Sequence, residues 1–212
     1  ADERLMTLGI QIVTEHLARA GVQAAVRAGP VAGTWHVNYA PPALPRTAII
    51  VHGSASGEEY VQTIASVLGK TAYPDLRVWL HVPRGSSEAA QACKALAAQD
   101  ARVGVLETTD ALGTVDADYL VFLRAGTLVV QPPWLERLVA QALQPAVGVV
   151  GARIVGLDQR IAGVGKILGA GPAGIAAPLQ PGLPHAAPGY LGRAQVAQDI
   201  SAVDGNGMLI ET

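Results

Sequence analysis

The sequence predicts an α/β fold, with an open, mostly parallel sheet and helices on both faces. The first observation is a set of short apolar runs, such as Tyr119-Leu-Val-Phe-Leu123, which are typical of strands buried on both faces. The second is that these runs end in polar or Gly-containing turns and alternate with amphipathic helical stretches. Right-handed crossovers between such strands produce a mostly parallel sheet. The third is size, because 212 residues, 50% of them hydrophobic, can bury a substantial core.

The first 45 residues are expected to form a lead-in to this domain. A helix over residues 3–20 is predicted by apolar residues at helical spacing, namely Leu5, Leu8, Ile12, Val13 and Leu17. Residues 22–28 and 34–39 alternate weakly and predict a hairpin. The stretch 40–45 holds three prolines in six residues and is expected to be a stiff linker without regular structure. The predicted domains are therefore residues 1–45 and residues 46–212.

The main domain is expected to alternate strands with helices. Strands are predicted at residues 47–51, 76–82, 102–106, 118–123 and 147–155. Helices are predicted at residues 58–68 and 88–99, with Ser87 suited to cap the second. A third helix is opened by Pro132-Pro133 and runs through Leu143, since proline fits the first helical turn.

The last fifty residues carry weaker signals. Residues 161–168 are expected to pair with a later segment of the chain, and the Gly- and Pro-rich stretch 169–189 is expected to be a loop. Residues 199–203 and 208–211 resemble strands, separated by Asp204-Gly-Asn-Gly207. The chain begins without Met and ends at Thr212 directly after an apolar run, so we expect a fragment of a longer protein.

Composition excludes several classes of function. The net charge is −2 and the basic residues are scattered, so neither nucleic acid nor a membrane surface is an expected partner. The one cysteine, Cys93, allows no disulfide and no cysteine-based metal site within the chain. It indicates a reducing compartment, so we expect a cytoplasmic location. No apolar run reaches 18 residues, and no transmembrane segment is expected.

The order of the elements resembles glycosyltransferase family 2, whose domains have the GT-A (nucleotide-diphospho-sugar transferase) fold. The resemblance covers nearly the whole chain and rests on the order and spacing of several segments: 118–123, 133–138, 147–152, 188–193 and 201–205. Residues 22–45 also resemble a lead-in that some members carry before the catalytic domain. The resemblance implies a GT-A-like domain and a nucleotide-sugar or a glycan as partner.

The resemblance fails at the donor-binding positions. The family places an Asp after the second strand to hold the nucleobase, where this chain has Pro83. It places paired Asp residues after the strand 118–123, where this chain has Ala125 and Gly126. Those carboxylates hold Mg²⁺ or Mn²⁺ on the donor diphosphate, because a hard cation needs carboxylate oxygens. With the ligands missing, we expect no metal cofactor. The family's His in a later segment corresponds to Gly163, and its general base would lie beyond Thr212.

These departures imply a glycosyltransferase-like domain that has lost catalysis. We expect a scaffold or partner-binding module in glycan or polysaccharide biosynthesis, joined to a protein partner or to further domains of a longer chain. Two alternatives stay open. One is an active nucleotide-sugar glycosyltransferase that uses Arg124 and Arg84 in place of the metal. The other is a plain α/β binding domain whose crevice takes another ligand.

The candidate nucleotide-sugar crevice lies at the carboxyl ends of the strands. Its residues are His52, Gly53, Ser54, Pro83, Arg84, Arg124, Ala125 and Gly126. The arginines are either phosphate ligands or solvated loop residues, and His52 is either an acid–base group or an ordinary turn histidine.

Asp204 is the catalytic candidate, as a base, although a tight turn also favours Asp for local hydrogen bonding. Asp116 and Asp118 precede their strand, so we expect them at the opposite end of the sheet from the crevice.

Overall fold

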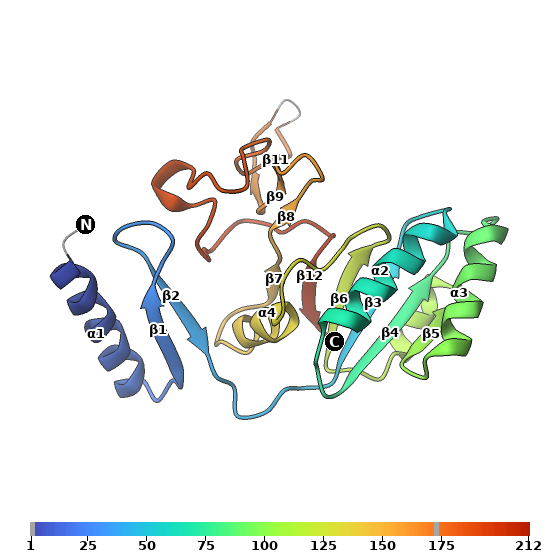
Figure 1. Ribbon diagram of the computed structural model, residues 1–212, viewed down its shortest axis with the longest axis horizontal. Helices are drawn as coiled ribbons and strands as arrows, with labels where there is room; N and C mark the ends of the chain where they lie inside the picture. Colours follow the sequence, from blue (N-terminus) through green and yellow to red (C-terminus); the bar gives the residue numbers. More distant parts are fainter. Residues whose placement is uncertain (1–2, 172–173) are drawn as a thin grey trace. The chain divides into compact units, whose positions relative to one another are not determined.

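The computed structural model describes residues 3–171 and 174–212 (Figure 1). The chain forms two compact units. Unit 1 comprises residues up to Pro42 together with Ala152–Asp204, and unit 2 comprises Ala43–Gly151 together with Gly205–Thr212. The division expected at residues 45 and 46 stays a prediction.

Unit 2 is built on a six-stranded sheet. Its strand order is β5 (Val103–Leu106), β4 (Leu76–His81), β3 (Thr47–His52), β6 (Tyr119–Arg124), β12 (Met208–Glu211) and β7 (Val149–Gly151). The first four strands run parallel, whereas β12 is antiparallel to both β6 and β7. β7 therefore runs in the same direction as β6, and the predicted mostly parallel α/β sheet is confirmed.

The central strands are buried on both faces, as their apolar runs predict. In β3 the first five residues are buried, and Ile49 pairs with Val78 of β4 and with Val121 of β6. Alternate side chains of a strand point to opposite faces of the sheet. β3 therefore contributes Ile49 and Val51 to the core on one face of the sheet, and Ala48 and Ile50 to the core on the other face.

Helices cover both faces of this sheet, but the α-helices share one of them. α2 (Gly57–Lys70), α3 (Ser87–Gln99) and α4 (Trp134–Ala142) all bury residues in the core that contains Ile49. α2 and α3 pack against each other there (Figure 1). On the other face, the short 3-10 helix η1 (Thr109–Thr114) contributes Ala111 and Leu112 to the core around Ile50.

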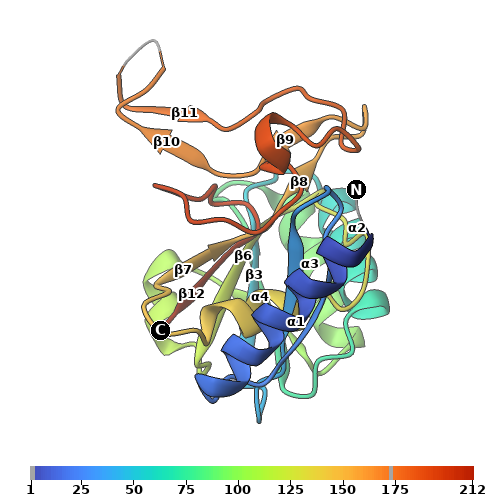
Figure 2. The same ribbon diagram turned by 90° about the vertical axis from the view of Figure 1, so that its left-hand side faces the viewer.

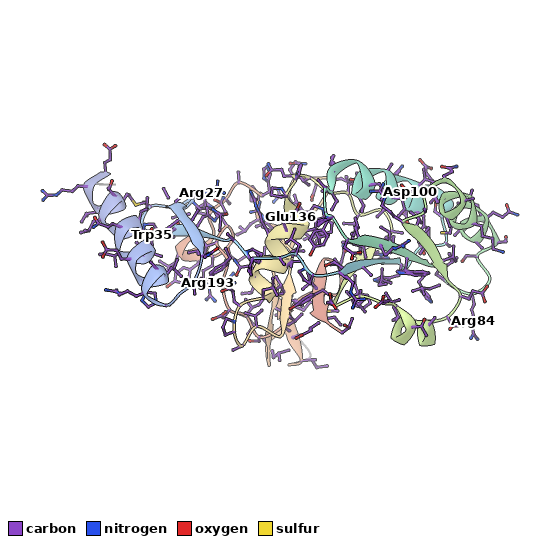
Figure 3. All side chains as sticks on the ribbon, turned by 90° about the horizontal axis from the view of Figure 1, so that it is seen from below. Arg27, Trp35, Arg84, Asp100, Glu136 and Arg193 are labelled. Atoms are coloured by element: carbon purple, nitrogen blue, oxygen red, sulfur yellow. The ribbon has the colours of Figure 1, made fainter. Side chains whose placement is uncertain are left out.

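The N-terminal part of unit 1 forms the predicted helix and hairpin. α1 (Glu3–Arg19) precedes β1 (Ala24–Ala28) and β2 (Trp35–Tyr39), which pair antiparallel. Gly9 of α1 lies against the indole ring of Trp35, where a Cβ would collide with the ring (Figure 3). This close approach explains a glycine in the middle of a helix, where it otherwise costs stability.

The rest of unit 1 consists of short strands. β8 (Ile154–Val155) pairs with β9 (Ile161–Gly163), and β10 (Lys166–Leu168) pairs with β11 (Ala176–Pro178) (Figure 2). A short 3-10 turn, η2 (Tyr190–Gly192), comes after them in the chain.

Three expectations for this region need correction. The single strand predicted at 147–155 is two strands, because β7 pairs with β12 while β8 pairs with β9. The predicted loop 169–189 contains β11. Residues 199–203 form no strand and make one isolated bridge, between Ala202 and Lys166. Ile200 instead packs its side chain against Gly165.

Candidate functional site

Three basic residues lie side by side at the carboxyl ends of the parallel strands. His52 ends β3 and is paired in register with His81 of β4 and with Arg124 of β6. This edge is where open α/β sheets bind ligands. The sequence singled out His52 and Arg124. His81 was missed, although its place near the end of a predicted strand was a usable signal.

The turn after β6 is fixed by hydrogen bonds from its own backbone. The Ala125 N–H donates to the carbonyl oxygen of His52 over 2.8 Å. The Gly126 N–H donates to Thr63 Oγ1 over 2.9 Å, and the Arg124 N–H donates to Asn206 Oδ1 over 3.0 Å. Three consecutive amides of this turn are thus used inside the protein.

Ala125 and Gly126, where the resemblance expects metal-binding carboxylates, differ in what a larger side chain would meet. The Ala125 side chain is buried, with the residue only 6% exposed. Gly126 has a φ of +89°, a conformation that side-chain-bearing residues rarely adopt. A Cβ built on Gly126 would lie 3.5 Å from the carboxyl carbon of Glu59, an exposed residue in the first turn of α2. Glu59 is a neighbour of this turn that the sequence reasoning missed, and no local pattern marks it.

Asn206 links the turn to the neighbouring strand β12. Its side-chain oxygen accepts from the Arg124 N–H and, over 3.2 Å, from the hydroxyl of Thr127. The next residue, Gly207, donates its N–H to the carbonyl of Phe122 over 2.8 Å. The sequence alone did not reveal Asn206, because only the antiparallel pairing of β12 with β6 brings it beside this turn.

The loop after β3 forms a turn that is stabilised by contacts within the loop. Gly53 has a φ of +88°, and a Cβ there would lie 3.7 Å from Arg124 Cγ. Ser54 is 8% exposed, and its hydroxyl accepts a hydrogen bond from the Ser56 N–H over 3.0 Å. These two predicted crevice residues therefore shape the loop beside Arg124.

The loop after β4 presents Pro83, which is half-buried, and Arg84, which is exposed (Figure 3). The side chains of Arg84 and Arg124 make no hydrogen bond or ion pair with the residues that the structure describes. Helix α3 begins at Ser87 itself, and no side-chain cap bond is made by the flanking Ser86. The predicted capping role of Ser87 is therefore wrong, since Ser87 lies inside the first turn.

The electrostatics of the edge disfavour a charged histidine at position 52. Burial lowers the pKa of His52 below its ordinary value, and the neighbouring His81 and Arg124 lower this pKa further. The imidazole also contacts the ring of Phe122 edge-on, with centroids 6.4 Å apart. His52 is thus more readily neutral than an exposed histidine.

The acidic candidates lie elsewhere. Asp204 belongs to unit 1, where its Oδ1 pairs with Lys166 Nζ at 2.8 Å. Its Oδ2 is buried beside Gly163 and has no hydrogen-bond partner among the described residues. A catalytic role for Asp204 stays a prediction. Asp116 and Asp118 both pair with Arg46 at the start of β3, which confirms that they lie at the opposite end of the strands.

The described part of the chain holds neither a cluster of metal ligands nor a membrane span. In residues 3–171 and 174–212, no group of three or more His, Cys, Asp or Glu side chains is placed to hold a metal ion. Within the same ranges, no helix combines the length and the apolar character needed to cross a membrane.

Two relatives of this chain are found by sequence, and no family model matches it. The chain is 30% identical over 209 residues to the uncharacterized protein y4gI of Sinorhizobium fredii (strain NBRC 101917 / NGR234), covering 92% of this chain and 23% of that protein. It is 29% identical over 172 residues to the O-antigen biosynthesis protein RfbC of Myxococcus xanthus, covering 76% and 13%. The chain thus spans less than a quarter of either relative.

The fold is similar to those of two glycosyltransferases of known structure. One is a mannosyltransferase from Pyrobaculum calidifontis in complex with GDP-Man and Mn²⁺, with a TM-score of 0.49 and 16% identity, covering 70% of this chain and 44% of that one. The other is GalNAc-T7 with UDP, GalNAc and Mn²⁺, with a TM-score of 0.39 and 16% identity, covering 51% and 22%.

Proposed function

We propose that this chain is a non-catalytic, glycosyltransferase-like domain that serves glycan biosynthesis as a scaffold or partner-binding module. The similarity to an O-antigen biosynthesis protein supports the glycan context. The feature that supports a loss of catalysis is the turn after β6, which holds Ala125 and Gly126 where the family resemblance expects metal-binding carboxylates.

The physical argument concerns the diphosphate of a nucleotide sugar. A divalent cation neutralises the charge that develops on this group as the sugar leaves, and such a cation is held by carboxylate oxygens. The turn supplies a buried methyl group and a hydrogen atom instead. Its amides are also engaged, with Thr63, Asn206 and the His52 carbonyl. Neither the side chains nor the amides of Ala125 and Gly126 are free to anchor the ligand.

A scaffold role is supported by what the chain keeps. The sheet of unit 2 retains a close-packed core, with Ile49, Val78 and Val121 fully buried across three adjacent strands. The relatives are more than four times as long as the matched region, so we propose that such a domain works beside further domains or a protein partner. The cytoplasmic location expected from the sequence also stays a proposal.

Isothermal titration with UDP- and dTDP-sugars, with and without Mn²⁺, tests the proposal. We expect no metal-dependent binding. Glu59→Gln is the informative variant, because Glu59 is the carboxylate beside the turn. Metal-dependent micromolar binding would end the non-catalytic account, and its loss in Glu59→Gln would assign the cation to this carboxylate of α2.

A second candidate function is an active transferase that neutralises the diphosphate with cationic side chains. Arg124 and Arg84 favour it, because neither side chain is paired with the described residues and arginine can bind phosphate through two parallel hydrogen bonds. Metal-free binding of UDP would support this candidate if Arg124→Ala abolishes the binding. The control variant Arg137→Ala, at an exposed residue of α4, is expected to retain it. Sugar transfer to an acceptor without metal would establish it.

A further inference from the structure

Unit 1 contains an open cavity of about 320 Å³ on its surface that the proposed function does not use. Its polar lining consists of Lys166, Arg193, Asp199 and Ser201. Apolar side chains, including Leu179 and Ile200, complete the lining. Small-molecule sites typically have volumes of about 300–1,000 Å³ and combine apolar walls with a few convergent polar groups. The cavity has a volume at the lower end of that range and a lining of both kinds, but it is open to solvent, and Arg193, Asp199 and Ser201 are exposed.

Two of the segments that line the cavity, β10 and residues 199–204, are held together by direct contacts. The Lys166 N–H donates to the carbonyl of Ala202 over 2.8 Å, and the Lys166 ammonium pairs with Asp204. Gly165 has a φ of +105° and lies so close to Ile200 that a Cβ would collide with that side chain. β10 and the segment 199–204 are therefore fixed against each other within unit 1.

Arg193 is held in place but keeps part of its hydrogen-bonding capacity. Its Nε donates to Gln198 Oε1 over 2.6 Å, and Gln198 Nε2 donates to the Arg193 carbonyl over 2.7 Å. The two terminal amino groups of the guanidinium make no hydrogen bond or ion pair with the described residues. A fixed guanidinium with free donors is suited to a planar carboxylate, which it can bind through two parallel bonds.

The other polar groups of the lining are suited to hydrogen-bond the hydroxyl groups of a ligand. Asp199 forms no ion pair with a cation among the described residues, so its carboxylate can accept hydrogen bonds from a ligand. Ser201 can donate and accept. Lys166 is partly neutralised by Asp204, which leaves Arg193 as the unpaired positive charge in the described lining of the cavity. The lining thus combines a carboxylate receptor, hydroxyl partners and apolar surface.

We propose that this cavity binds an acidic sugar, a hexuronic acid or a glycan unit that carries one. Arg193 takes the sugar carboxylate, Asp199 and Ser201 take ring hydroxyls, and Leu179 and Ile200 cover C–H surface. The choice of a sugar rests on the proposed role in glycan biosynthesis, whereas the preference for a carboxylate rests on Arg193.

Nuclear magnetic resonance titration of the ¹⁵N-labelled protein with glucuronate, glucose and acetate tests the inference. We expect glucuronate to shift the signals of the Arg193 Nε–H and of amides at 165–166 and 199–202, with at least tenfold higher affinity than glucose or acetate. Equal affinity for glucose would show that the cavity does not recognise the carboxylate and would overturn the inference. Equal affinity for acetate would reduce the cavity to an anion site and would also overturn the inference.

Two variants at one position and a matched control complete the test. Arg193→Ala is expected to weaken glucuronate binding at least tenfold, and Arg193→Lys to retain an intermediate affinity, because lysine keeps the charge but not the two-pronged geometry. Arg27→Ala, on β1 of the same unit, is the control and is expected to bind as the parent does. Unchanged binding in Arg193→Ala with a native spectrum would overturn the inference.

The outcome is independent of the nucleotide-sugar experiments. Binding of a nucleotide sugar would shift signals of His52 and Arg124 in unit 2, whereas glucuronate is expected to shift signals in unit 1. The two proposals can therefore fail independently, because each predicts shifted signals in a different unit.

Discussion

Gly126 lies beside Glu59 with a φ of +89°, and a Cβ on Gly126 would stand 3.5 Å from the Glu59 carboxyl carbon. A carboxylate restored at this position would meet backbone strain and a like charge together. We predict that Gly126→Asp lowers the free energy of unfolding by about 1–3 kcal/mol, since a non-glycine residue in a sparsely populated conformation costs about that much.

Urea denaturation measures this effect, and Gly148→Asp is the matched control. Gly148 is exposed in the same unit, and a Cβ there meets no atom within 4 Å. Surface changes of this kind usually alter stability by no more than about 0.5 kcal/mol. Equal losses in the two variants would contradict the strain argument.

Asn206→Ala is predicted to loosen the turn after β6. The change removes the acceptor for the Arg124 N–H and the Thr127 hydroxyl, and a typical hydrogen bond contributes about 0.5–1.5 kcal/mol to stability. Hydrogen exchange at the Arg124 amide is expected to accelerate while exchange at Val78, in the centre of the sheet, changes little. An unchanged Arg124 exchange rate would mean that the bond contributes nothing to local order.

His52 is predicted to make stability depend on pH in the mildly acidic range. Its ordinary pKa is 6.5, and burial together with His81 and Arg124 lowers the folded-state value. As the pH falls below about 6.5, the unfolded chain takes up the proton first, so the free energy of unfolding decreases until the folded-state pKa is passed. Stability from neutral His52 is thus present at neutral pH and lost in acid.

Chemical denaturation between pH 5 and 8 tests this linkage. His52→Asn is expected to flatten the slope, whereas the α1 control His16→Asn retains it because His52 is still present. A slope that survives unchanged in His52→Asn would assign the effect to other groups.

Cys93 is predicted to be unreactive in the folded protein. The residue is fully buried on α3, and burial raises the pKa of its thiol to about 11. The thiolate is the reactive form, so both access and ionisation oppose alkylation at neutral pH. Iodoacetamide is expected to label the protein in denaturant and not in buffer. Rapid labelling of the native protein would show that α3 opens readily.

Much of the fold can be predicted from local pattern. The apolar runs at β3 and β6 predict strands because both faces are buried, and the Gly-containing turns mark where they end. The predicted strand 208–211 coincides with β12. Residues 199–203 misled because an alternating pattern can pack one side chain, here Ile200 on Gly165, without joining a ladder.

The candidate site was only partly visible in the sequence. His52 and Arg124 were found because they end strands, and strand ends converge in a parallel sheet. Glu59, Thr63 and Asn206 reach the same turn from other segments of the chain, and local spacing does not encode such contacts. The grouping of residues 152–204 with the N-terminal segment is likewise a tertiary property.

The central claim is that the turn after β6 cannot hold a cation on a nucleotide sugar. Paramagnetic Mn²⁺ added with a UDP-sugar tests it most directly, because Mn²⁺ broadens the signals of nearby amides. The account predicts no selective broadening at Ala125 and Gly126. Selective broadening there that requires the nucleotide sugar and disappears in Glu59→Gln would contradict it.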